Sequence, residues 1–165
     1  MTTNPVLSSK TIRIPNYLWL QTWGGLRDRG QGSRESAAIW GGKRIGNSET
    51  VEAVYYLDDF EGGFRSRAYH FVSTEALAQL FAKLHREKHV IIGDVHTHPT
   101  SWVGLSQIDR EHPIEFRHGL HALVLPSFAL LSPSLRLTGV HVYQGDGKWQ
   151  TLNDAAKSQT FIFTE

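Results

Sequence analysis

The chain has 165 residues, of which 40% are hydrophobic and 20% are charged, a composition typical of one globular domain. Seventeen basic and sixteen acidic side chains give a formal net charge of +1, so no charge excess favours binding to nucleic acid or to an acidic membrane. Cysteine is absent and no apolar run approaches the roughly 18 residues of a membrane span, so we expect a cytoplasmic protein without disulfides or thiol chemistry.

The first part of the chain predicts two strands separated by a helix. Residues 1–10 are polar, and we expect them to form a flexible end before a single domain that spans residues 11–165. Residues 11–14 alternate in polarity as a strand does. Residues 16–26 have apolar side chains at helical spacing, although two glycines weaken the end of this helix. Residues 35–42 then read as a buried strand that runs into a glycine turn.

The middle of the chain predicts two strands around a polar loop, followed by the clearest helix. Residues 50–57 are rich in β-forming side chains, and residues 69–72 are expected to return as a further strand. The intervening residues 58–67 have the polar, glycine-containing composition of a loop. Leucine and phenylalanine recur every three or four positions in residues 74–88, and Ser73 can cap the first amides of this helix.

The last part of the chain predicts a core strand, a loop, a short helix and several further strands. Residues 89–95 form the core strand, residues 96–104 the loop and residues 105–116 the helix. The remaining predicted strands are residues 121–125, 135–143, 149–152 and 160–164. Strands and helices mix without regular alternation, which predicts an α/β domain with one mixed sheet flanked by helices.

Two histidines separated by one residue lie at the exit of the predicted core strand. In an extended chain the side chains of His96 and His98 point to the same side, so both imidazoles can reach one ion. A catalytic zinc site needs a third protein ligand, and Asp109 in the next predicted helix is the best candidate. Ser106 lies three residues earlier on the same helix face. Taken singly, these residues could equally be a surface histidine, a helix cap or a carboxylate near a helix dipole.

The combination of these residues resembles the signature of the JAMM (JAB/MPN) metalloprotease family. With Glu35 upstream, the pattern is E…HTHP-x(6)-S-x(2)-D, and Pro99 also matches the family. The small, apolar and glycine positions after the glutamate are matched by Ala38, Trp40 and Gly42. The tryptophan that the family often carries before the first histidine is replaced by Asp94. The resemblance covers most of the chain and implies the JAB/MPN fold, with layering like that of cytidine deaminases.

The resemblance implies a one-zinc hydrolase and a role for each motif residue. One Zn²⁺ per chain would bind His96, His98 and Asp109, with water in the fourth position. Glu35 would be the general base that accepts the proton of this water and passes it to the departing amine. Ser106 would donate its hydroxyl to the oxyanion of the tetrahedral intermediate.

The same resemblance implies a substrate class. Small single-domain members cleave the peptide or isopeptide bond that follows the C-terminus of a ubiquitin-like protein, either in deconjugation or in maturation, including in bacterial antiviral conjugation systems. Trp102 lies between the ligands, where a substrate tail would pass. The alternatives are a sulfur-carrier precursor peptidase and a non-catalytic MPN scaffold that binds partner proteins.

Histidines outside the motif are expected to have ordinary structural roles. We expect a helix-surface or pre-proline role for His112, with an extra metal ligand or a partner of the ligands as the alternative, and we place His118 and His121 at a rim or in a loop. Asp94 lies two residues before His96 and so can share its face and hydrogen bond to it.

Overall fold

A computed structural model describes residues 10–60 and 72–165 of the chain. One mixed eight-stranded sheet organises these residues in the order β7-β6-β5-β4-β2-β3-β1-β8. The strands are β1 (Thr11–Pro15), β2 (Ala37–Ile45), β3 (Ser48–Tyr56), β4 (Val90–Thr97), β5 (His121–Leu125), β6 (Gly139–Gly145), β7 (Lys148–Thr151) and β8 (Phe161–Thr164). The helices are α1 (Asn16–Gly30), α2 (Thr74–Glu87), α3 (Gln107–Glu111) and α4 (Asp154–Thr160). This single α/β domain with a mixed sheet confirms the predicted fold class.

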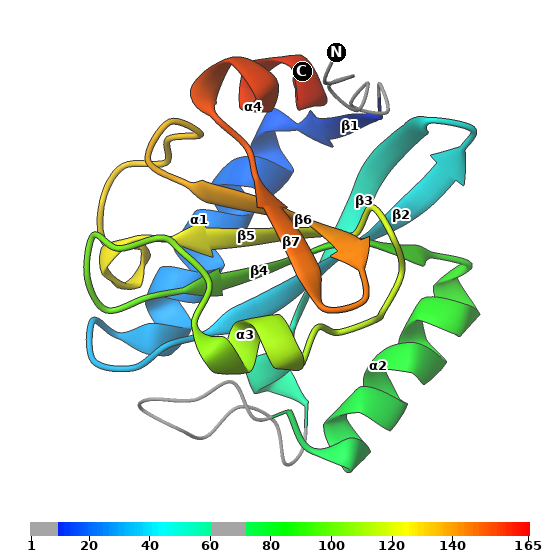
Figure 1. Ribbon diagram of the computed structural model, residues 1–165. Helices are drawn as coiled ribbons and strands as arrows, with labels where there is room; N and C mark the ends of the chain where they lie inside the picture. The colour runs from blue at the N-terminus through cyan, green and yellow to red at the C-terminus, as the bar shows by residue number, and fades with distance from the viewer. Residues whose placement is uncertain (1–9, 61–71) are drawn as a thin grey trace.

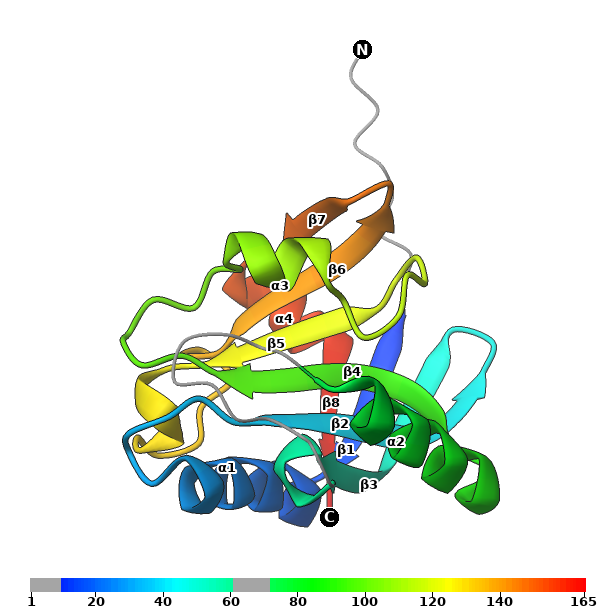
Figure 2. The same cartoon turned by 90° about the horizontal axis from the view of Figure 1, so that it is seen from below.

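Helices cover both faces of the sheet, as Figures 1 and 2 show. Helix α1 lies on one face, where Trp23 and Leu26 pack with Trp40 and Leu123 in the larger apolar cluster. On the opposite face, α2 packs Leu80 and Leu84 against the sheet in a second apolar cluster. Helix α3 lies on the same face as α2. Within the described ranges, no helix is long and apolar enough to span a membrane.

Most predicted strands are present, with limits that differ by a few residues. The strands predicted at 11–14, 35–42, 50–57, 121–125 and 160–164 correspond to β1, β2, β3, β5 and β8. The predicted hairpin is β6 and β7, which pair antiparallel, although its first strand begins only at Gly139. Strand β4 extends through Thr97, so His96 lies within a strand, not in the predicted loop. The tail at 1–9, the strand predicted at 69–72 and most of the 58–67 loop lie outside the described residues.

Helix limits follow from caps and from proline. Ser73 Oγ accepts a hydrogen bond of 3.1 Å from Ala76 N, which confirms the predicted cap of α2. Helix α1 continues to Gly30, past its predicted end, and Gly25 leaves room for the Tyr56 hydroxyl to donate to Gln21 O at 2.6 Å.

The helix predicted at 105–116 is wrong in extent, because α3 has only five residues. Pro113 disfavours helical geometry at the residue before it, and His112 accordingly leaves the helical region with φ −127° and ψ 58°. Helix α4 was not predicted from the sequence. Asn153 caps it by accepting a 2.9 Å hydrogen bond from Ala156 N, a signal that the sequence does contain.

Candidate metal centre

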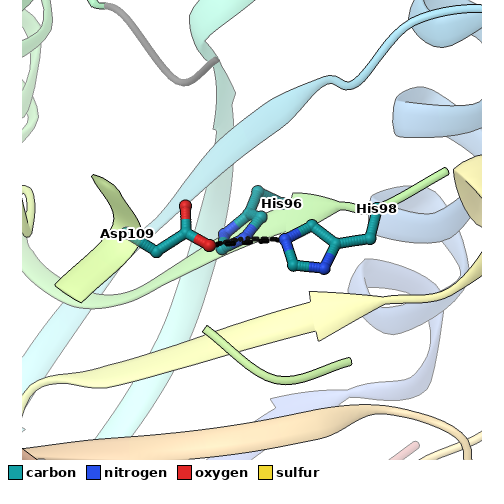
Figure 3. A group of neighbouring side chains, drawn as sticks. All are labelled: His96, His98 and Asp109. Carbon is teal, nitrogen blue, oxygen red and sulfur yellow. Dashed lines mark hydrogen bonds and ion pairs between the residues drawn. The ribbon is translucent and has the colours of Figure 1, made fainter. Parts of the chain in front are cut away.

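Three predicted ligand atoms meet at the end of β4, as Figure 3 shows. The Nε2 atoms of His96 and His98 lie 3.2 Å apart. Oδ2 of Asp109 lies 3.4 Å from Nε2 of His96 and 3.3 Å from Nε2 of His98. All three side chains are buried, with at most 5% of the side-chain surface exposed. The three residues therefore form a compact group that could hold a metal ion.

The distances between the three ligand atoms fit a metal ion with tetrahedral coordination. Ligand atoms bound at about 2.0–2.1 Å from a tetrahedral metal lie about 3.3–3.4 Å from one another. The observed separations of 3.2–3.4 Å match this spacing without any rearrangement of the side chains.

Hydrogen bonds on the far side of each imidazole orient the two rings. Nδ1 of His98 lies 3.1 Å from the carbonyl oxygen of Trp102. Nδ1 of His96 lies 3.5 Å from Oδ1 of Asp94, as the sequence predicted. In the neutral imidazoles, acceptors at both Nδ1 atoms favour the tautomer with the proton there, which leaves the Nε2 lone pairs directed toward the space between the three ligand atoms.

Ser106 positions Asp109 through a capping box at the start of α3. The backbone N–H of Ser106 donates to Oδ2 of Asp109 at 2.8 Å, and Ser106 Oγ accepts from Asp109 N at 3.1 Å. The carboxylate oxygen that faces the histidines is thus held by the helix cap. Since the Ser106 hydroxyl acts here as an acceptor, its own proton is still available for another partner.

Glu35 reaches the same place from the neighbouring strand. Strands β2 and β4 are antiparallel with Ala37 opposite His96. The next pair, Ser36 and Thr97, continues this register, since Thr97 N donates to Ser36 O at 3.0 Å. Extended by one more residue, this register brings Glu35, two residues before β2, opposite His98, and its carboxyl is close enough for the charges of His98, His96 and Asp109 to act on it.

Burial and neighbouring charges shift the ionisation of the site. Burial raises the pKa of the Glu35 carboxyl above its ordinary value, and Asp109 adds to this, while the two histidines oppose it. A carboxylate with a raised pKa is a better proton acceptor. Burial by itself lowers the pKa of His96, but hydrogen bonds to Asp109 and Asp94 outweigh it and raise that pKa to about 10. The carboxylates thus create a buried site that attracts positive charge.

The loop between the ligands places an indole against the site. Trp102 stacks on His98, with ring centroids 5.2 Å apart and an interplanar angle of 16°, while 56% of its surface remains exposed. Gly104 packs so closely under the indole that a Cβ there would lie 2.7 Å from the ring. Trp102 therefore lies in the loop between the candidate ligands, at the solvent-exposed rim of the candidate metal centre.

His141 was missed as a contributor to this loop. His141 is part of β6, and its Nε2 lies 2.8 Å from Val103 O while its Nδ1 lies 2.9 Å from Thr151 Oγ1. Its ring therefore links the loop that carries Trp102 to strand β7. No local motif marks His141, because only the pairing of strands brings it beneath the loop. The expectation for His121 was wrong: it is 3% exposed and packs edge-on against Phe161 in the sheet.

A cavity of about 290 Å³ opens beside the three ligands. Asp94, His96, Asp109 and His112 form its polar wall. Apolar side chains from β2 and from the segment after α3 form much of the rest, including Ala37, Ile39 and Ile114. The candidate metal centre therefore adjoins a cavity with both polar and apolar walls.

Comparison with known proteins supports the fold alone. No protein-family model matches the sequence. The solution structure of a Desulfitobacterium hafniense protein is similar with a TM-score of 0.62 and 20% identity, over 94% of each chain. The solution structure of a Salinibacter ruber protein is similar with a TM-score of 0.59 and 13% identity, over 86% of this chain and 88% of that one.

Proposed function

We propose that the protein is a zinc-dependent peptidase that hydrolyses the peptide or isopeptide bond after the C-terminus of a ubiquitin-like protein. The observation that carries this proposal is the meeting of His96, His98 and Asp109 in a tetrahedral ligand spacing with Glu35 beside them. These are the residues that the JAMM-like pattern predicted.

The donor set supports zinc as the metal. Two imidazole nitrogens and one carboxylate oxygen are typical zinc ligands, and three protein ligands leave one position open, as in catalytic sites. Softer sites with thiolates are not available, because the chain has no cysteine. When bound, zinc would supply a water whose pKa is lowered from about 15.7 toward about 7.

The protein's own residues would move and stabilise charge around this water. Glu35 would accept a proton at its carboxylate and deliver it to the departing amine, a role that suits its raised pKa. Ser106 would donate its hydroxyl proton to the developing oxyanion while its Oγ still accepts from Asp109 N. Asp94 and Trp102 would keep the two imidazoles in the ligating orientation through their contacts at Nδ1.

The proposed substrate class rests on the family resemblance, and the site's shape is compatible with it. The adjoining cavity has largely apolar walls and suits an extended, uncharged peptide segment next to the scissile bond. The compact single domain resembles small prokaryotic deconjugating peptidases, and we extend the proposal to a role beside a ubiquitin-like conjugation system, such as one for antiviral defence.

Zinc content and cleavage test the proposal together. The wild type and Asp109→Asn should be purified side by side, and we expect close to one zinc per chain in the wild type and little in the variant. The zinc-loaded wild type should then cleave linear fusions that carry a ubiquitin-like protein before the scissile bond, whereas Glu35→Gln should hold zinc and not cleave. A folded wild type that takes up no zinc, even after reconstitution, would instead indicate a non-catalytic scaffold.

A further inference from the structure

A second and larger cavity, of about 690 Å³, lies on the other face of the sheet from the metal centre. Consecutive residues of a strand face opposite sides, and Ala122 of β5 lines the cavity beside the metal centre while His121 lines this one. Residues of β6, β7 and α4 complete its wall, among them Val142, Gln150 and Gln159. The sheet itself therefore separates the two cavities.

Three cationic side chains gather at this cavity around one buried carboxylate. Lys10, Arg44 and Arg117 all line the cavity, and each pairs with Oε1 of Glu49, which is fully buried. Nε of Arg44 lies 3.6 Å and Nη1 of Arg117 lies 3.9 Å from this oxygen. Arg117 also pairs with Glu115 at 2.7 Å. Among the described residues, three cations against two carboxylates leave one positive charge in excess.

The cationic side chains lie close enough together to shift one another's pKa values. Burial, followed by the positive charges of Arg117 and Arg44, lowers the pKa of Lys10 to about 8. Burial and Arg117 also lower the pKa of Arg44. Like charges brought together in a partly buried site repel, and a bound anion would relieve this repulsion.

Uncharged polar groups also line the wall of the cavity. The His121 ring is part of this wall and is 3% exposed. The amides of Gln144, Gln150 and Gln159 line the same space.

From this arrangement we propose that the cavity binds a small phosphate ester, with its phosphate at Lys10, Arg44 and Arg117 and its polar body along the glutamine-lined wall. Guanidinium groups bind phosphate oxygens through paired hydrogen bonds and are well suited to this role. The volume far exceeds that of inorganic phosphate and falls within the range of small-molecule sites. This site is independent of the proposed peptidase activity.

Calorimetric titration with adenosine 5′-monophosphate and with inorganic phosphate tests the proposal on both metal-free and zinc-loaded protein. We expect the nucleotide to bind more tightly than phosphate and with the same affinity in both forms, because the sheet separates the cavity from the metal centre. Arg44→Gln should weaken binding by roughly tenfold to a hundredfold, since a charged hydrogen bond is lost. Arg86→Gln on the exposed surface of α2 removes the same charge elsewhere and should leave the affinity unchanged.

A second variant separates ligand binding from the stability of the Glu49 cluster. Gln150→Glu places a negative charge on the cavity wall without touching an arginine, and it should abolish binding in a protein that remains folded by circular dichroism. Gln79→Glu, on the exposed face of α2, is its matched control. The proposal is overturned if neither probe binds the wild type at millimolar concentration, if binding requires zinc, or if Arg44→Gln and Gln150→Glu bind as the wild type does.

Discussion

Ser36, which directly precedes β2, and Thr97 of β4 exchange hydrogen bonds in both directions. Ser36 N donates to Thr97 Oγ1 at 2.9 Å, and Thr97 N donates to Ser36 O at 3.0 Å. Each of the two residues is a direct neighbour in sequence of a residue of the candidate site. Glu35 precedes Ser36, and His98 follows Thr97. This pair therefore fixes the register at which the proposed base meets the proposed ligands.

Thr97→Val should lower both stability and activity. The substitution leaves the fully buried Ser36 N–H without its acceptor, at a cost of about 1–3 kcal/mol in the free energy of unfolding. A displaced Glu35 should lower cleavage by up to about a hundredfold. Thr22→Val is the matched control, because it deprives Trp40 Nε1 of its acceptor on the α1 face. Chemical denaturation and cleavage assays should show similar destabilisation in both variants and lost activity only in Thr97→Val.

Glu35→Gln should separate metal binding from catalysis. The amide keeps the shape of the side chain but cannot accept the proton, so turnover should fall by about a hundredfold to ten-thousandfold. Zinc per chain, measured by elemental analysis, should equal that of the wild type because Glu35 is outside the three-ligand group. Wild-type turnover in this variant would remove Glu35 from the mechanism.

Ser106→Ala should lose more activity than its capping role explains. Loss of a serine cap costs about 0.5–2 kcal/mol of stability, and loss of an oxyanion donor costs about a hundredfold to a thousandfold in turnover. Ser73→Ala removes the equivalent cap of α2, whose Oγ accepts from Ala76 N at 3.1 Å. Thermal unfolding should shift in both variants, whereas turnover should fall only in Ser106→Ala. Equal turnover in the two variants would leave Ser106 with a capping role alone.

Trp102→Ala should weaken substrate binding more than the chemical step. The indole is 56% exposed at the rim of the metal centre, so its loss should raise KM by roughly tenfold with little change in kcat. The His98 contact at Trp102 O comes from the backbone and survives the substitution, so zinc content should be retained. A lower zinc content with unchanged KM would show that the indole only supports the ligand.

His121 should make the protein less stable in acid. Burial, together with the positive charge of Lys10, lowers the pKa of His121 from 6.5 to about 3. Between pH 3 and pH 6.5, His121 is therefore protonated in the unfolded chain and neutral in the folded chain. The free energy of unfolding should therefore fall as the pH drops below 6.5, by up to about 1.4 kcal/mol per pH unit, and His121 should have no such effect above that pH. His121→Leu should flatten this slope in urea titrations at several pH values. His118→Leu, at an exposed position, should retain it.

The sequence predicted the candidate site better than it predicted the segments around it. His96, His98, Ser106 and Asp109 lie within 14 positions of one another, and strand alternation and helix spacing place them together. Glu35 could be included only through the resemblance, because the pairing of β2 with β4 is a long-range relation that no local pattern encodes.

The wrong predictions for the helix at 105–116 and for His121 have different causes, one in the local sequence and one in tertiary packing. The predicted helix at 105–116 stopped early because Pro113 outweighed the apolar spacing. His121 was misplaced because its position at the start of β5 resembles a loop boundary, whereas the packing of Phe161 from the far edge of the sheet buries it. That contact joins residues 40 positions apart and cannot be read from either segment by itself.

The position of β1 has a consequence for the order in which the protein forms. This strand pairs in parallel with β3 on one side and with β8 on the other, so its second edge is completed only when residues 161–164 are available. The five residues of the candidate site have all been synthesised by residue 109. Pairings between distant segments form late, because a long loop must close first. A growing chain thus contains all five residues of the candidate site before any partner exists for the second edge of its first strand.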